Sequence, residues 1–193
     1  MNPTVIVLGG VNGAGKTTAS RSLLANTLRV MTFVNADVIA QGLSGFNPEA
    51  AAIRAGRIML EQLDDLAAQR ANFAFETTLA GRAYAGWLDS LRGRGYDVDL
   101  FYFWLADVET AVARVATRVA KGGHDVPEKT IRQRYPRSIR NLFHLYLPVV
   151  TTWKVYDNNV AGSPVLLAEG GRGVAETVYD AATWSLVRST GNA

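Results

Sequence analysis

The sequence predicts an α/β fold in which helices cover both faces of a mostly parallel sheet. Short β-rich runs alternate with helical patterns along the chain, and this alternation is typical of such sheets. The first three runs are nearly all apolar, as expected for strands that are buried on both faces. The predicted strands are residues 5–8, 32–34, 73–75, 98–105 and 154–156, with 165–167 as a candidate extra edge strand.

The first strand leads into the motif G-x-x-x-x-G-K-T at residues 10–17, which is followed by a helical pattern. In this context the glycines let the backbone wrap round phosphates, Lys16 can reach the β- and γ-phosphates, and the Thr17 hydroxyl is the expected Mg²⁺ ligand. The alternative is a glycine-rich turn that binds nothing. The residues expected to contact a nucleoside triphosphate are Gly10, Asn12, Gly13, Ala14, Gly15, Lys16, Thr17 and Thr18.

Composition indicates a single domain spanning residues 1–193. The chain is 48% hydrophobic, and no stretch between the apolar segments has the composition of a linker. No apolar run approaches the roughly 18–20 residues of a membrane span, and the N-terminus lacks the pattern of a signal peptide, so we expect a cytoplasmic protein. The absence of cysteine excludes disulfides, thiolate metal ligands and cysteine nucleophiles.

Positive charge is concentrated in residues 111–140. This segment holds eight of the twenty Lys and Arg residues, against only Asp125 and Glu128, while the whole chain has a net charge of +3. Because the basic character is local, it favours a site for a polyanionic small molecule over a nucleic-acid surface. We therefore expect residues 111–140 to form a helical, arginine-bearing lid.

Two helices are predicted for this lid. One begins near Asp107, and the other follows Gly122-Gly123, with Asp125 as N-cap and Glu128 completing a capping box. Pro136 is expected to bend or interrupt the second helix. The apolar stripe expected on its continuation is Ile139, Leu142, Phe143 and Tyr146.

Two further helices are predicted outside the lid. Asn47-Pro48 should start a long helix, since Asn caps well and Pro suits the first turn. Its face toward the sheet is expected to contain Ile53, Gly56, Leu60, Leu63 and Ala67. A closing helix is predicted for about residues 172–187, with Val174, Val178, Ala182 and Leu186 as core contacts.

Two carboxylates follow predicted strands that should lie beside the phosphate loop. Asp37 is placed to accept the proton of an attacking hydroxyl, although it could equally cap the turn that follows it. Glu76 directly follows an apolar strand, where an acidic group orders Mg²⁺. Thr78 and Arg82 are candidate substrate contacts; the alternatives are an ordinary turn threonine and a surface arginine.

Several arginines of the lid could neutralise a phosphoryl group during transfer. A solvated helix face is the alternative for each of them, and we expect two or three to act, with Arg118 and Arg134 as the best candidates. His124 lies in the turn between the lid helices, as a polar turn residue or a catalytic one. The arginine candidates are Arg114, Arg118, Arg132, Arg134 and Arg137.

These segments together resemble the zeta toxin family of P-loop kinases, in particular its short chromosomal members, often labelled predicted ABC-type ATPases. The resemblance is carried by residues 10–18, by Asn-Ala-Asp at 35–37, by Phe-Glu-Thr-Thr at 75–78, and by Gly-Gly-His-Asp-Val-Pro at 122–127 with Arg-Tyr-Pro-Arg-Ser at 134–138. It covers about residues 4–157.

The resemblance implies a three-layer α/β/α fold with a five-stranded parallel sheet of order 2-3-1-4-5. It implies ATP- and Mg²⁺-dependent phosphorylation of a sugar hydroxyl, which in zeta toxins belongs to a UDP-N-acetyl amino sugar, and it leaves room for an antitoxin-like protein partner. By position, Asp37 would be the general base, Lys16 the phosphate-loop lysine, Glu76 and Thr78 the pair that holds substrate, and Arg114 or Arg118 the lid arginine. The chain has His124 where zeta toxins carry a second lid arginine.

Two other functions compete with a small-molecule kinase. The first is an ATP-binding switch or ATPase that has no small-molecule acceptor. The second is a nucleic-acid kinase or binder that uses the basic lid, which would show a steep salt dependence of oligonucleotide binding. We rank the nucleic-acid function last, because the positive charge is compact and is expected to face the phosphate site.

Overall fold

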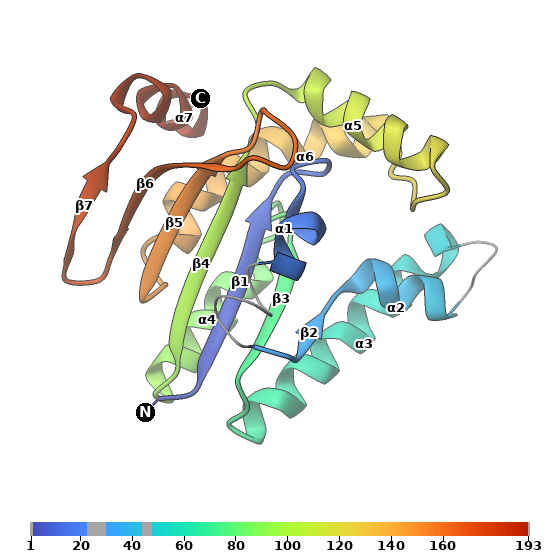
Figure 1. Ribbon diagram of the computed structural model, residues 1–193. Helices are drawn as coiled ribbons and strands as arrows, with labels where there is room; N and C mark the ends of the chain where they lie inside the picture. Colours follow the sequence, from blue (N-terminus) through green and yellow to red (C-terminus); the bar gives the residue numbers. More distant parts are fainter. Residues whose placement is uncertain (1, 23–29, 44–47, 193) are drawn as a thin grey trace.

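The computed structural model describes residues 2–22, 30–43 and 48–192 (Figure 1). In this part of the chain, no helix combines the length and the apolar character needed to cross a bilayer. The elements in chain order are β1 Thr4–Gly10, α1 Lys16–Ser22, β2 Phe33–Val34, α2 Ala36–Leu43, α3 Pro48–Ala68, β3 Phe73–Thr77, α4 Ala83–Gly93, β4 Asp97–Trp104, α5 Val108–Ala120, α6 Glu128–Asn141, a π-helical turn Leu142–Tyr146, β5 Thr152–Asp157, β6 Val165–Gly171, β7 Val174–Val178 and α7 Ala181–Asn192.

The sheet has the order β2-β3-β1-β4-β5-β6-β7. The first five of these strands are parallel, which confirms the predicted order 2-3-1-4-5, and β1 lies at their centre, with Val7 opposite Phe75 of β3 and Leu100 of β4. The strands β6 and β7 extend the sheet in antiparallel fashion. The candidate strand at 165–167 is therefore real but longer than expected, and β7 was not predicted.

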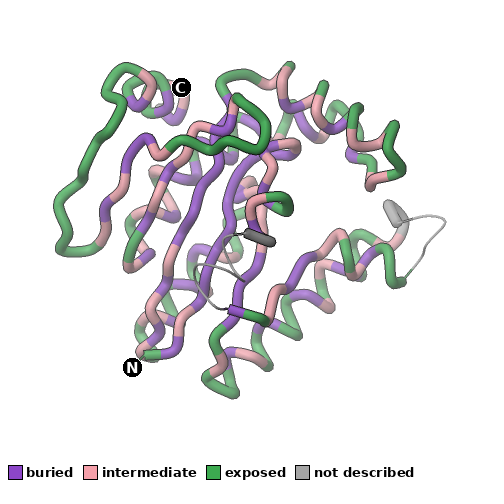
Figure 2. Tube along the Cα trace, viewed as in Figure 1, coloured by how far each residue is buried: buried purple, intermediate pink, exposed green. Residues whose placement is uncertain are grey.

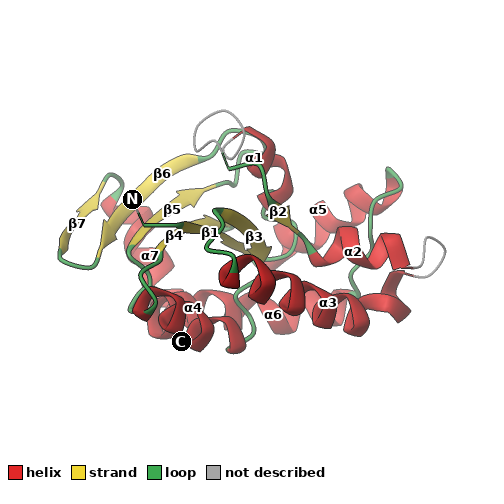
Figure 3. Cartoon of the chain, turned by 90° about the horizontal axis from the view of Figure 1, so that it is seen from below, coloured by secondary structure: helices red, strands yellow, loops and turns green. Residues whose placement is uncertain are grey.

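Helices lie on both faces of the sheet. In Figure 3 α1 is on one side, while α4, α6 and α7 are on the other. Aromatic packing attaches α4 and α7 to this second face of the sheet. Phe75 of β3 packs on Tyr84 of α4 with ring centroids 5.1 Å apart, and Trp153 of β5 stacks on Trp184 of α7 with ring centroids 5.8 Å apart. Both β1 and β4 are buried along most of their length (Figure 2). This burial explains why their sequences read as almost continuous apolar runs.

The buried face of α3 differs from the predicted one. Leu63 and Ala67 are buried as expected, but Ile53 is 76% exposed and Leu60 is 40% exposed. The buried stripe is Ala55, Met59, Leu63 and Ala67, while Gly56 is half-buried. A spacing of four places these side chains in one narrow row, which suits a helix that packs on α2 and the β2 edge instead of lying flat on the sheet. The predicted cap Asn47 lies outside the described residues.

The predicted closing helix over about residues 172–187 is wrong in its first half and confirmed from residue 181 onward. Residues 165–178 form the β6–β7 hairpin, and α7 begins only at Ala181, with the Asp180 carboxylate accepting from the Thr183 amide at 3.0 Å. The four predicted core contacts Val174, Val178, Ala182 and Leu186 are exposed, and Trp184 and Val187 are buried instead. Three of the five residues after the turn at Gly173, whose φ is 74°, are β-branched, and such residues favour a strand over a helix.

The second lid helix begins near the expected place but without the predicted capping box. Pro127 precedes α6, the Asp125 carboxylate accepts from the adjacent Val126 amide, and Glu128 pairs with Arg132. Pro136 does not interrupt α6, since one proline removes one hydrogen bond and the helix is held by its buried face. The irregularity comes later, as the π-turn over residues 142–146. In the predicted stripe, Ile139, Leu142 and Tyr146 are buried and Phe143 is half-buried.

The α3 face gives a test of the core. We expect Leu63→Ala to lower the free energy of unfolding by about 2–5 kcal/mol, because it removes a fully buried side chain. The matched change Ile53→Ala, on the exposed side of the same helix, should stay within about 0.5 kcal/mol of wild type. Urea denaturation followed by circular dichroism measures both free energies of unfolding. Equal losses for the two variants would contradict the assignment of Leu63 to the packed face of α3.

Candidate active site

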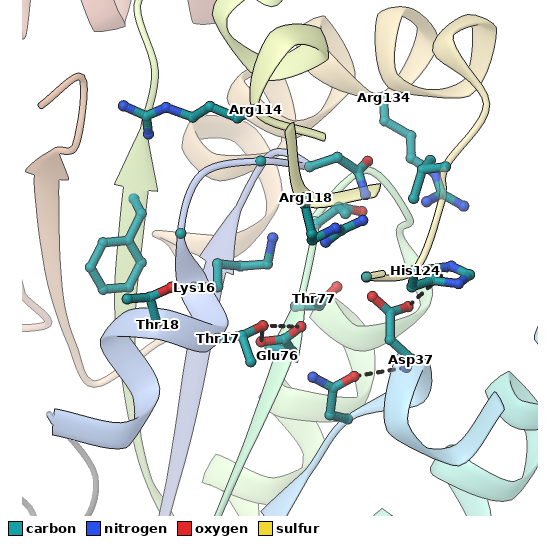
Figure 4. A pocket seen from close by; sticks show the side chains of 18 of the residues that line it. Lys16, Thr17, Thr18, Asp37, Glu76, Thr77, Arg114, Arg118, His124 and Arg134 are labelled. Carbon is teal, nitrogen blue, oxygen red and sulfur yellow. Dashed lines mark hydrogen bonds and ion pairs between the residues drawn. The ribbon is translucent and has the colours of Figure 1, made fainter. Parts of the chain in front are cut away.

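A cleft of about 1570 Å³ opens at the carboxyl ends of the parallel strands. Its walls come from the phosphate loop, from the chain that follows β2 and β3, from the α5–α6 turn, and from the segment after β5. In open α/β sheets this is the edge where ligands bind. The cleft therefore brings together segments that lie far apart in sequence (Figure 4).

The phosphate loop is held by close contacts that only glycine allows. Gly13 has φ of 77° and Gly15 has φ of 83°. A Cβ at Gly13 would lie 2.7 Å from the Ala111 carbonyl oxygen of α5, and one at Gly15 would lie 2.6 Å from the Asn158 amide. Side chains at these positions would push the loop away from α5 and from the end of β5.

Lys16 lies buried at the centre of the loop. Its ammonium donates to the carbonyl oxygens of Gly10 at 2.8 Å and Val11 at 3.0 Å. An ammonium has three donors, so one remains for an anion in the cleft. Burial lowers the pKa of Lys16; the charges of Glu76 and Asp37 oppose that shift, and those of Arg118 and Arg134 add to it. An anion close to this group would favour its charged form.

Thr17 and Glu76 form an oxygen-rich pair beside Lys16. The Thr17 hydroxyl donates to the Glu76 carboxylate at 2.9 and 3.2 Å (Figure 4). Hydroxyl and carboxylate oxygens are the ligands that Mg²⁺ prefers, and in nucleotide sites it takes only one or two carboxylates and completes its shell with phosphates and water. No cluster of three acidic or histidine side chains occurs among the described residues. The pair fits a Mg²⁺ ion that is shared with a phosphate ligand.

The Asp37 carboxylate is not the cap of α2. Asn35 takes that role: its side-chain oxygen accepts from the Asp37 amide at 2.7 Å and from the Val38 amide at 3.4 Å. Asp37 is left with its carboxylate in the cleft, 45% exposed, and 3.9 Å from Nε2 of His124, whose side chain is 13% exposed. The alternative of a capping aspartate is therefore excluded by the geometry.

Arg118 of α5 and Arg134 of α6 both point into the cleft (Figure 4). Nε and one terminal nitrogen of Arg118 are buried and have no hydrogen-bond partner within the described part of the chain. An unpaired buried guanidinium is costly, and a phosphate group would satisfy it. Both arginines are also near enough to Lys16 to lower its pKa. Three cations therefore line the same cleft.

The remaining predicted arginines have other surroundings. Arg114 donates to the carbonyl oxygens of Asn158 at 2.8 Å and Asn159 at 2.6 Å, so it ties α5 to the segment after β5 while also lining the cleft. Arg132 pairs with Glu109 and Glu128 on the outside of the lid. Arg82 is exposed and does not line the cleft. Arg137 does line it, although sequence reasoning preferred Arg134.

Thr78 lines the cleft at the end of β3. Its hydroxyl accepts from the Ala80 amide at 3.4 Å, so it takes part in a turn while also lining the cleft. The other predicted loop residues lie as expected: Asn12 and Thr18 line the cleft, and Ala14 is buried beneath it.

Sequence reasoning missed the wall that follows β5. The Asn158 amide donates to the Ala14 carbonyl at 2.7 Å, and half-buried Tyr156 stacks on Phe103 with ring centroids 5.5 Å apart. All of these residues except Ala14 line the cleft. A signal was present, since Asp-Asn-Asn at 157–159 directly follows a predicted parallel strand, as Asp37 and Glu76 do.

Comparison with known proteins gives the family. A family model described as "AAA domain" matches residues 5–136, more than half of the chain. The chain belongs to this AAA-domain family. An uncharacterized protein from Haemophilus influenzae is 31% identical to it over 135 residues, which cover 70% of this chain and 94% of that protein.

Solved structures show the fold of this AAA-domain protein more broadly. A chain in the crystal structure of AvrRxo1-ORF1:-ORF2 with ATP has a TM-score of 0.77 and 17% identity, covering 98% of this chain and 64% of its own length. A chain of the PezAT chromosomal toxin-antitoxin system of Streptococcus pneumoniae has a TM-score of 0.66 and 20% identity, covering 98% of this chain and 78% of that one. The chain spans less than two thirds of the length of the first of these. The likenesses confirm the predicted α/β fold with its central parallel sheet.

The contacts of Arg114 give a test of the cleft wall. We expect Arg114→Ala to lower the free energy of unfolding by about 1.5–3 kcal/mol, because two partly buried carbonyl groups lose a charged donor. Arg132→Ala should shift the urea midpoint far less, since its ion pairs are solvent-exposed. A larger shift of the urea midpoint for Arg132→Ala than for Arg114→Ala would contradict the assignment of Arg114 as the arginine that supports the cleft wall.

Proposed function

We propose that the protein is an ATP- and Mg²⁺-dependent kinase that transfers the γ-phosphoryl group to a hydroxyl of a small molecule. The observation that carries this proposal is the position of Asp37. Because Asn35 caps α2, the Asp37 carboxylate is not used as a cap, and it lies 3.9 Å from His124 in the same cleft as Lys16, Thr17 and Glu76. A carboxylate that faces the cleft beside an anion site is what proton removal from an acceptor requires.

Each side of the cleft then has a role in the transfer. The bond between the γ-phosphorus and the bridging oxygen breaks, a bond to the acceptor oxygen forms, and Asp37 takes the acceptor proton. Lys16, Arg118 and Arg134 stabilise the charge on the transferring group and on the leaving diphosphate. Thr17 and Glu76 would hold Mg²⁺, which supplies charge neutralisation at the β- and γ-phosphates. Positioning and electrostatics supply most of the rate in such reactions.

The acceptor that we propose is a UDP-N-acetyl amino sugar or a related sugar. Support comes from the segments shared with the zeta toxin family and from the shared fold with a chain of the PezAT toxin-antitoxin system. An antitoxin-like protein partner follows from the same reasoning. In this proposal residues 1–193 act as one kinase domain, with a lid at about residues 111–140, and Thr78 contacts the acceptor. The ATP in the AvrRxo1-ORF1:-ORF2 structure supports ATP as the donor.

The direct test incubates the protein and Mg·ATP with a panel of UDP-sugars, free sugars and nucleosides. A new phosphomonoester detected by ³¹P NMR and mass spectrometry would identify the acceptor. ATP consumption that no acceptor changes would favour an ATPase instead, and transfer to an oligonucleotide would favour a nucleic-acid kinase.

Asp37→Asn should lower the rate of phosphoryl transfer by about 10²–10⁴-fold, the usual contribution of a general base. ATP binding, measured by titration calorimetry, should change little. Asp125→Asn is the matched control, because that carboxylate also lines the cleft but bonds the Val126 amide. Turnover retained by Asp37→Asn would remove Asp37 from the role of base.

Lys16→Ala should raise the activation barrier by about 2.7–4 kcal/mol, the effect of removing one preorganised charge or donor from a transition state. Lys129→Ala, on the exposed side of α6, serves as the control for loss of a positive charge. Single-turnover rates at saturating ATP measure both. Equal rates for the two variants would contradict the placement of Lys16 at the reacting phosphate.

A further inference from the structure

The loop between β3 and α4 has an unusual backbone on the acceptor side of the cleft. Thr78, Ala80 and Gly81 line the cleft, whereas Leu79 between them is buried and has φ of 56°. Residues other than glycine rarely adopt positive φ, and such a conformation persists only where the surrounding structure holds it. The contacts that hold residues 78–81, which we call the acceptor loop, therefore set the shape of this side of the cleft.

Three side chains from one continuous helical segment hold the acceptor loop. The Ser138 hydroxyl donates to the carbonyl oxygen of Thr78, the Asn141 amide donates to that of Leu79 at 2.8 Å, and the Tyr146 hydroxyl donates to that of Gly81 at 2.7 Å. All three donor residues are buried. The loop is fixed at three carbonyl groups within four residues.

Tyr102 of β4 completes this network from the sheet. A serine hydroxyl has one hydrogen, and Ser138 uses it for Thr78, so the Tyr102 hydroxyl must donate to Ser138 across their 2.9 Å contact. Burial raises the pKa of Tyr102 and of Tyr146, so both keep their protons at neutral pH. The network links the centre of the sheet, the lid helix and the acceptor loop.

The π-turn over residues 142–146 brings Tyr146 into register. An α-helix turns about 100° per residue, so Tyr146, eight residues after Ser138, would point about 80° away from it in a regular helix. A π-turn accommodates one extra residue, which reduces that difference to about 20°. The turn is marked by the Leu147 amide donating to the Leu142 carbonyl at 2.9 Å. Without it, Tyr146 would not share the face of Ser138.

The same helix carries cations into the cleft. Arg134 lies one turn before Ser138, and both Arg134 and Arg137 line the cleft. The position of these guanidinium groups relative to the acceptor loop is therefore set by side chains of a single segment. A shift of the loop away from α6 would move an acceptor relative to Arg134.

We propose that Ser138, Asn141 and Tyr146 are positioning residues that hold the acceptor loop at a fixed distance from the lid cations. They act through the loop backbone and do not touch the reacting atoms. This inference rests on the proposed kinase function, and it adds a group of buried residues to the determinants of acceptor binding.

The test compares Tyr146→Phe with Tyr135→Phe. Tyr135 lies on the same helix, is also buried, and donates to the Leu105 carbonyl at 2.8 Å, so both changes remove one similar hydrogen bond. We expect Tyr146→Phe to raise the KM for the acceptor by about 3- to 10-fold, the range expected for one lost hydrogen bond. The KM for ATP of Tyr146→Phe should equal that of the control Tyr135→Phe. Amide exchange in a peptide covering residues 76–82, followed with and without Mg·ATP, should be faster only in Tyr146→Phe.

The acceptor for these rates is the compound that becomes phosphorylated in the panel described above. If wild type phosphorylates an acceptor, and Tyr146→Phe and Tyr135→Phe have the same KM for it, the positioning role is overturned while the kinase proposal stands. A KM for ATP that rises as much as the KM for the acceptor would also overturn it, because that result indicates a general structural loss. If wild type phosphorylates no acceptor, the kinase proposal fails and acceptor positioning fails with it, whatever the exchange of the loop shows.

Discussion

The cleft depends on holding several like charges along its walls. Lys16, Arg118 and Arg134 all line it; burial lowers the pKa of Lys16, and the charges of the two arginines lower it further. Glu76 and Asp37 oppose that repulsion, and the carbonyl oxygens of the phosphate loop accept from the ammonium. A triphosphate would satisfy the remaining donors, including the unpaired nitrogens of Arg118. The three cations outnumber the two carboxylates Glu76 and Asp37, so the site is suited to an additional anion.

The sheet supplies the rigid part of this arrangement. Lys16 and Asp37 follow parallel strands and Glu76 lies near the carboxyl end of β3, and these strands end at one edge of the sheet, with β1 between β3 and β4. The phosphate loop is then fixed from the side by α5, which approaches Gly13, and by Asn158, which bonds the Ala14 carbonyl. Arg114 joins those two supports to each other. The loop can remain open toward the cleft because its outer surface is held at several points.

Irregular backbone gathers on the acceptor side. Leu79 has a positive φ, which a leucine side chain disfavours, and a π-turn lies in the helical segment that contacts its loop. Such features are held by buried polar contacts from Ser138, Asn141 and Tyr146. Structures that hold strained segments in this way often do so next to binding sites, where position matters more than local stability.

The sequence by itself determined the phosphate loop and the five parallel strands, because motif spacing and apolar runs are local signals that a buried sheet imposes on each strand, while the order of the strands followed from the resemblance to the zeta toxin family. It misjudged the face of α3 and the hairpin formed by β6 and β7, because rotation of a helix and pairing of an edge strand depend on neighbours that are distant in the chain. Only the tertiary structure decided that Asn35 caps α2 in place of Asp37, that Arg114 supports the wall, and that Tyr146 reaches Gly81. Each of those outcomes depends on which hydrogen-bond partner a side chain takes. That partner is determined only once the folded chain has brought the competing groups together.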